Sequence, residues 1–175
     1  RLAACGVNTV QTVRRPGRES PPACTLAGPG AGSADWRSLS ARRLALMIIT
    51  SIERGTRWML FEPNEPPAWR RAAAQVRAFL ASLEERGAFA HREPGDRWFV
   101  LCDERVNRER HREQGIVNLM FGFPAARAGG FHAYLVSHRA GGSRVQTVSP
   151  NLVGLPGTGL TLALAELELP EVESA

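Results

Sequence analysis

Two stretches of the chain carry apolar residues at three- and four-residue steps, which is the period of an amphipathic helix. The first follows Ser38 or Ser40, either of which can cap a helix, and it ends at Gly55, where a positive φ is expected. The second runs from about residue 67 to residue 86 and closes at Gly87. The apolar positions are Ala41, Leu44, Ala45, Ile48, Ile49 and Ile52 in the first stretch, and Trp69, Ala72, Ala73, Val76, Phe79, Leu80 and Leu83 in the second. The spacing predicts two helices, each with one face toward a core.

Short runs of apolar and β-branched residues predict strands between and around these helices. The runs are residues 6–13, 23–28, 56–62, 97–104, 115–123 and 129–138. Residues 56–62 and 97–104 are apolar on both faces, which is typical of central strands. The order of elements predicts an α/β (α+β) fold with a mixed β-sheet flanked by two main helices.

The residue composition of the chain changes after residue 138. Residues 139–159 are rich in turn-forming residues, and a strand-like alternation of leucines follows. We therefore expect an α/β domain over residues 1–138, with an N-terminal strand pair or arm at 1–27 and a core at 36–138, and a C-terminal extension over 139–175. The C-terminal segment is either a strand of this domain or an arm for a neighbour. The strand-like positions of the two terminal segments are Val7, Val10, Val13, Leu160, Leu162, Leu164, Leu167 and Leu169.

The sequence FEPNEPPAW at residues 61–69 has two interpretations. Glu62 and Glu65 are two carboxylates three residues apart, which suggests a catalytic pair, although glycosidase carboxylates normally come from separate elements. The other interpretation is a stiff joint between a strand and a helix, because prolines preset the first helical turn and Asn64 or Glu65 can accept its free amides. We favour the joint, whose residues are Phe61, Glu62, Pro63, Asn64, Pro66, Pro67 and Trp69.

The composition of the chain limits the classes of protein to which it can belong. A chain of 175 residues with 43% hydrophobic and 22% charged residues is typical of one globular domain. No uninterrupted apolar stretch approaches the length of a membrane span, and we expect none. The chain begins at Arg1, and we expect an upstream region.

The formal charge of +5 comes entirely from arginines, which are scattered and interleaved with acidic residues, so nucleic-acid binding is a distant hypothesis. Three widely spaced cysteines favour reduced thiols. The histidines His91, His111, His132 and His138 lack metal-ligand spacing, and we expect His91 and His111 to be solvated in loops. No cofactor motif is present, so we expect neither a metal nor a cofactor.

Several features occur together in one order. Arg42 and Arg43 open the first helix, the run Phe61–Asn64 precedes Trp69, and the second helix ends with Phe79, Leu80 and Gly87. RWFVLCDE, VN and GIVNLMFGFPAARAGGFHAYLV follow. This string resembles the C-terminal domain of contractile tail sheath proteins over roughly residues 1–138. The resemblance departs at Gly130–Phe131, where the family usually has an acidic residue, and it leaves residues 139–175 unexplained.

The resemblance implies a non-enzymatic structural subunit that stacks in helical rings around an inner tube. Its partners would be other copies of itself, the tube, the baseplate and the tail terminator, in a virion tail or, for a prophage or injection-system particle, in the bacterial cytoplasm. Terminal arms would add strands to neighbouring sheets, so the resemblance makes residues 7–13 and 160–169 candidate inter-subunit strands. A diverged cap, terminator or binding module at the tail end is the alternative, and an enzyme using Glu62 and Glu65 is a third hypothesis.

Overall fold

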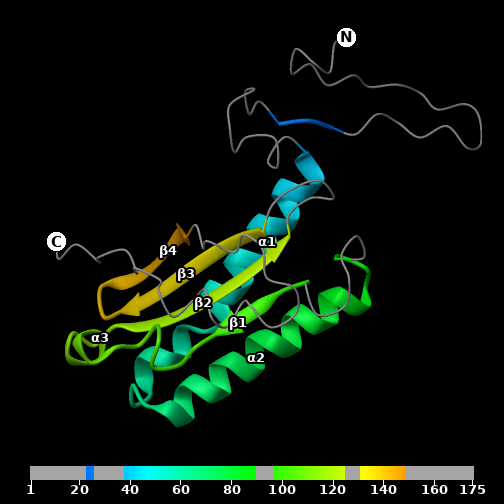
Figure 1. Ribbon diagram of the computed structural model, residues 1–175. Coiled ribbons are helices and arrows are strands. Elements are labelled where there is room, and N and C mark those ends of the chain that lie inside the picture. Colours follow the sequence, from blue (N-terminus) through cyan, green and yellow to red (C-terminus); the bar gives the residue numbers. More distant parts are fainter. Residues whose placement is uncertain (1–22, 26–37, 90–96, 125–130, 149–175) are drawn as a thin grey trace, which may run out of the picture. The chain divides into compact units, whose positions relative to one another are not determined.

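The computed structural model describes residues 23–25, 38–89, 97–124 and 131–148 (Figure 1). The chain divides into two compact units, one of residues 1–48 and 125–130 and the other of residues 49–124 and 131–175. In the first unit the described residues are 23–25 and 38–48, where Cys24 forms an isolated antiparallel bridge with Ser38. The predicted strand at 6–13 and the strand-like segment at 160–169 lie outside the described residues. The second unit contains the sheet and the rest of the helical structure.

Helix α1 spans Leu39–Gly55, as the apolar spacing predicted. The hydroxyl oxygen of Ser38 accepts a hydrogen bond from the backbone amide of Ala41 at 3.4 Å, so Ser38 is the capping residue. The expected positive φ at Gly55 is wrong. The amide of Thr56 still bonds to the carbonyl of Ile52 at 3.0 Å, so helical hydrogen bonding continues past the glycine.

The strand predicted over residues 56–62 is also wrong. Arg57–Phe61 forms a 3₁₀ helix, η2, in which only Met59 is buried. The amide of Met59 bonds to the carbonyl of Thr56, and the amide of Glu62 bonds to the carbonyl of Met59. An apolar run this short does not distinguish a strand from a helical turn by its period, and here the turn continues from α1. Phe61, assigned to the sheet from its sequence, is 90% exposed.

Helix α2 spans Pro66–Glu85, close to the predicted bounds, with both prolines in its first turn. Its buried face matches the predicted stripe, with Trp69, Val76 and Leu80 at its centre. Gly87, two residues after the last residue of the helix, has a φ of 82°. The amides of Gly87 and Ala88 bond to the carbonyls of Glu84 and Leu83, so a glycine is needed there to reverse the chain.

Four strands form an antiparallel sheet in the order β1-β2-β3-β4. The strands are β1 (Phe99–Leu101), β2 (Val117–Pro124), β3 (Phe131–Arg139) and β4 (Gly142–Val148), and a short helix, α3 (Glu109–Glu113), lies between β1 and β2. The α+β class is confirmed, although the described strands pair only antiparallel where a mixed sheet was expected. Strand β4 was not predicted. It lies in the turn-rich segment 139–159 and pairs with β3, so the sheet extends past the predicted boundary at residue 138.

Helix α2, η2 and Thr56 at the end of α1 lie on one face of the sheet. Phe121 and Phe123 of β2 share this face with their β3 neighbour Tyr134, at ring-centroid distances of 5.7 Å. Phe89, which follows α2, lies 6.2 Å from Phe123. Thr56, which links α1 to η2, contacts His138 of β3 on the same side. The opposite face has its own apolar cluster, formed by Val106, Met120, Ala133, Leu135 and Val148 with Phe99 and Leu101 packed against it.

Candidate functional site

The joint, residues 61–69, connects η2 to α2 and is held by the side chain of Asn64. The Asn64 Nδ2 group donates to the carbonyl oxygen of Ile116 at 2.9 Å, and Asn64 Oδ1 accepts from Trp69 Nε1 at 2.8 Å. Arg112 Nε donates to the backbone oxygen of Asn64 at 3.2 Å, and the Arg112 guanidinium lies 5.8 Å from the centre of the Trp69 ring. One asparagine therefore ties the first turn of α2 to the segment that enters β2.

The prolines of the joint determine its backbone conformation. Glu62 and Glu65 both have extended backbones, with φ of −115° and −135°, and each precedes a proline. The helical region is sterically disfavoured for a residue before proline. Pro63 therefore stops η2, and Pro66 sets Glu65 as the capping residue of α2. Neither Asn64 nor Glu65 makes the predicted side-chain cap. Glu65 is the capping residue without a side-chain bond, and Asn64 Oδ1 accepts from the Trp69 side chain instead of a backbone amide.

Glu62 and Glu65, the candidate catalytic pair, are both exposed. Glu62 pairs with Arg71 at 2.7 Å, and the Arg71 guanidinium lies 3.9 Å from the centre of the Trp58 ring. The Glu65 carboxylate makes no hydrogen bond or ion pair in the described part of the chain. The two carboxylates therefore share no enclosed site.

Gln75 joins the outer side of η2 to α2. Its Oε1 accepts from Trp58 Nε1 at 2.9 Å, and its Nε2 donates to the carbonyl oxygen of Gly55 at 3.0 Å. One side chain of α2 thus holds both the C-terminus of α1 and the start of η2. Gln75 therefore attaches α2 to the start of η2, and Asn64 attaches α2 to the segment that enters β2.

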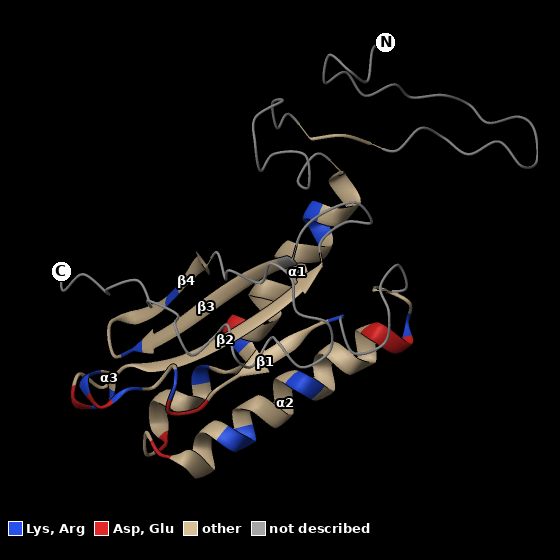
Figure 2. Ribbon diagram, viewed as in Figure 1, with Lys and Arg blue, Asp and Glu red and all other residues tan. Residues whose placement is uncertain are grey.

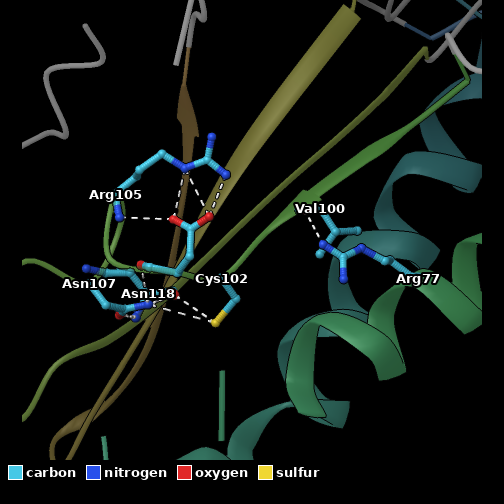
Figure 3. A network of polar contacts seen from close by, with 7 residues as sticks. Arg77, Val100, Cys102, Arg105, Asn107 and Asn118 are labelled. Atoms are coloured by element: carbon cyan, nitrogen blue, oxygen red, sulfur yellow. Dashed lines mark hydrogen bonds and ion pairs between the residues drawn. The ribbon is translucent and has the colours of Figure 1, made fainter. Parts of the chain in front are cut away.

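A second polar cluster, which the sequence did not predict as a site, lies where β1 ends (Figure 3). The Asn107 side chain exchanges two hydrogen bonds with the backbone of Asn118, donating to its carbonyl at 2.9 Å and accepting from its amide at 2.6 Å. The Asn118 side chain in turn donates to Val106 O and accepts from Ser137 Oγ. The Asn107 amide therefore takes the place of a strand residue beside β2 after β1 has stopped. A lone asparagine in the apolar run GIVNLMFGF was the signal for this network.

The two edges of the sheet differ. Strand β1 is three residues long, and its Val100 carbonyl accepts from Arg77 Nη2 of α2 at 3.3 Å (Figure 3). Strand β4 is seven residues long and pairs only with β3 among the described strands. Natural edge strands are commonly protected by shortness, by charge or by a covering element. In the described part of the chain, the β1 edge is protected in two of these ways, and β4 is the long open edge.

Among the described residues His111 and His138 are buried, although His111 was expected to be solvated. His138 Nε2 lies 2.8 Å from Thr56 Oγ1, and His138 Nδ1 lies 2.7 Å from Ser143 Oγ. Thr56 uses its only hydroxyl proton on the carbonyl of Ile52, so it accepts from His138, whose Nδ1 then accepts from Ser143. Burial lowers the His138 pKa. His111, expected in a solvated loop, lies in α3 at 6% exposure, and burial lowers its pKa too.

A cavity of about 380 Å³ lies between the first turns of α2 and the segment that follows β1. Pro66 and Trp69 line one side, and Cys102 lies opposite them. Burial raises the pKa of the Cys102 thiol to about 12, so it stays protonated at neutral pH. Neither carboxylate of the proposed catalytic pair lines this cavity.

The other predicted residues lie in the elements expected for them. Arg42 and Arg43 are exposed on α1, Phe79 is half-buried and Leu80 is fully buried on α2. The candidate inter-subunit strands through Val7 to Val13 and Leu160 to Leu169 lie outside the described residues.

Charge in the described part of the chain is mixed in sign. Arginine and acidic positions alternate in and around α3, and both signs occur on α2 (Figure 2). Within the described residues no group of three or more His, Cys, Asp or Glu side chains is arranged to hold a metal ion. No helix among them has the length and hydropathy required to cross a membrane.

No protein-family model matches the chain, and neither a curated protein nor a solved structure shows a significant match to it.

Proposed function

We propose that this chain is a structural subunit of a contractile tail sheath, which assembles with copies of itself in helical rings around an inner tube and contracts to drive the tube out. The proposal starts from the ordered string of sequence features that resembles the C-terminal domain of sheath proteins. Under this proposal the further partners are the tube, the baseplate and the tail terminator, and the protein belongs to a virion tail or to an injection-system particle in the bacterial cytoplasm.

The observation that carries the proposal furthest is the unequal protection of the sheet edges. Subunits joined by added strands need an exposed sheet edge that accepts a strand. Strand β4 offers seven residues on an edge that no other described strand occupies, whereas β1 is short and contacted by Arg77. An arm from a neighbouring copy is the natural occupant of such an edge in a self-assembling protein.

The braced joint supports the same proposal mechanically. A sheath subunit has to move as a rigid body while the lattice changes from one packing to another. Asn64 and Gln75 each connect two elements of the second unit through pairs of hydrogen bonds. We expect these contacts to make the connection between η2 and α2 stiff.

Val145 provides a test, because it lies at the middle of β4, opposite Val136 of β3. Val145→Lys puts a charge on the edge and opposes strand addition, whereas Val145→Thr keeps a β-branched residue there as the control. We expect the full-length Val145→Thr protein to sediment as assemblies like the wild type and the Val145→Lys protein to remain small. Equal assembly of the two folded variants would contradict a role for this edge. Binding to tail tubes without any self-association would favour the alternative, a cap or terminator.

A further inference from the structure

Phe61 is an aromatic side chain presented to solvent on a rigid turn. It is 90% exposed, whereas the other exposed large hydrophobic residues among those described, Leu39, Leu46 and Met47, are 38 to 47% exposed. The turn beneath it is fixed, because Met59 is buried and its carbonyl accepts from the amide of Glu62 at 3.3 Å. A single exposed apolar residue is ordinary, but a nearly fully exposed phenylalanine on a braced turn has the form of a docking contact.

The charged groups next to Phe61 are already paired. Glu62 forms an ion pair with Arg71 at 2.7 Å, and Arg57 forms one with Glu53 at 2.6 Å. A partner that covers Phe61 therefore does not have to bury an unpaired charge from these four residues, which would be costly. This arrangement fits an interface in which an apolar centre is surrounded by neutralised polar groups.

The cavity beside Trp69 is a candidate receptor for such a side chain. Its volume of about 380 Å³ lies at the small end of the range for ligand pockets, and Pro66 and Trp69 give it an apolar wall. Arg70 and Glu104 line it as well, and neither side chain has a partner in the described part of the chain. Phe61 itself does not line it, so the exposed aromatic and the cavity are separate patches of one surface.

One available ion pair, between Glu65 of one copy and Arg70 of another, favours a second copy of this chain as the occupant. Glu65 follows Phe61 by four residues, is exposed, and has no side-chain partner among the described residues. Arg70, which lines the cavity, is also exposed and has no side-chain partner among the described residues. When Phe61 of one copy enters the cavity of another, Glu65 of the first is available to pair with Arg70 of the second.

We propose that Phe61 of one copy inserts beside Trp69 in the cavity of a second copy, forming a subunit contact additional to strand exchange at β4. The inference rests on the proposed function, because it assumes that the chain self-associates. Since the two patches differ, the contact is heterologous and repeats from copy to copy into a ring or a helix. Neither strand addition at β4 nor the family resemblance predicts these interface residues.

The test uses two complementary variants of the full-length protein. Phe61→Ala removes the aromatic and leaves the cavity open, whereas Glu104→Trp fills the cavity from an exposed position and leaves Phe61 intact. The controls are Leu46→Ala, which truncates an exposed apolar residue elsewhere, and Glu104→Ala, which removes the charge without filling the cavity. Circular dichroism establishes that each variant is folded, and sedimentation velocity over a concentration series measures association.

We expect each of the two variants alone to associate on the order of 10- to 100-fold more weakly than the controls, the range for losing one buried aromatic contact. An equimolar mixture should associate more strongly than either variant alone, because one intact aromatic then meets one intact cavity. If wild type and both folded variants assemble equally, this contact is absent while the proposed self-assembly stands. If Phe61→Ala weakens association but Glu104→Trp does not, Phe61 docks elsewhere and the inference fails. A wild-type protein that stays monomeric at all concentrations overturns the proposed function together with this contact.

Discussion

Asn64 is the residue on which the rigidity of the joint depends most, and replacing it should destabilise the protein measurably. Asn64→Ala removes the donor to the Ile116 carbonyl and the acceptor for Trp69 Nε1. Ile116 and Trp69 are only 5% and 2% exposed, so their polar groups lose partners in a largely dry environment. Each buried group left without a partner costs about 1–3 kcal/mol. Allowing for water entering the space left by the amide, we expect a loss of about 2–4 kcal/mol.

Two further substitutions separate the causes. Asn64→Asp keeps an acceptor for Trp69 but sets a carboxylate oxygen against the Ile116 carbonyl oxygen, so the two acceptors repel each other and it should cost at least as much as Asn64→Ala. Glu65→Ala alters the neighbouring exposed position, whose side chain has no partner among the described residues, and should change stability by about 0.5 kcal/mol or less.

Urea unfolding followed by far-UV circular dichroism gives the free energies. With a slope of about 2 kcal/mol per M, the Asn64→Ala midpoint should move down by roughly 1–2 M. An Asn64→Ala midpoint that coincides with that of Glu65→Ala would refute the reasoning, because it would show that these hydrogen bonds add nothing to the folded state.

Three further predictions concern the sheet. Asn107→Leu keeps the approximate size but leaves the amide of Asn118 without its partner and its carbonyl with only the weak Cys102 thiol donor, so urea unfolding should show a loss of about 1–3 kcal/mol. Gly122→Ala places a methyl group against the ring of its cross-strand neighbour Phe99 and should lower stability by about 1–3 kcal/mol, visible as a lower thermal midpoint. The folded-state pKa of His138 is below its usual value of about 6.5, so in acid the unfolded chain binds a proton that the folded protein does not. Stability should therefore fall as pH drops below about 6.5, and His138→Gln should reduce that slope in urea titrations at several pH values.

Helix α2 shows what the sequence could predict about the fold. Its apolar spacing, its two leading prolines and the glycine after its end are local signals, and each has a local physical consequence. Strand β2 was equally visible, because a long apolar run buried on both faces has few other interpretations. These elements depend little on distant parts of the chain.

The elements that the sequence did not predict depend on context. The run at 57–61 is a 3₁₀ helix because α1 continues through Thr56 and Pro63 then stops the turn. Strand β4 has a weak pattern of half-buried residues, and it is a strand because β3 supplies its hydrogen bonds. Propensity alone is a poor guide to such edge strands.

The candidate site was predicted in part. The joint at 61–69 was recognised from its prolines, but the role of Asn64 was not, because its partner Ile116 is 52 residues away in the chain. The bond between Asn107 and Asn118 and the cavity beside Trp69 likewise join segments that only folding brings together. Sequence spacing carries no signal for such contacts.

Self-assembly is the central claim, and electron microscopy of the full-length protein tests it most directly. At concentrations where sedimentation shows association, we expect helical tubes or stacked rings, and we expect the Val145→Lys variant to lack them while Val145→Thr retains them. A folded wild-type protein that remains monomeric across the concentration range, with no tubes or rings in the images, would contradict the claim.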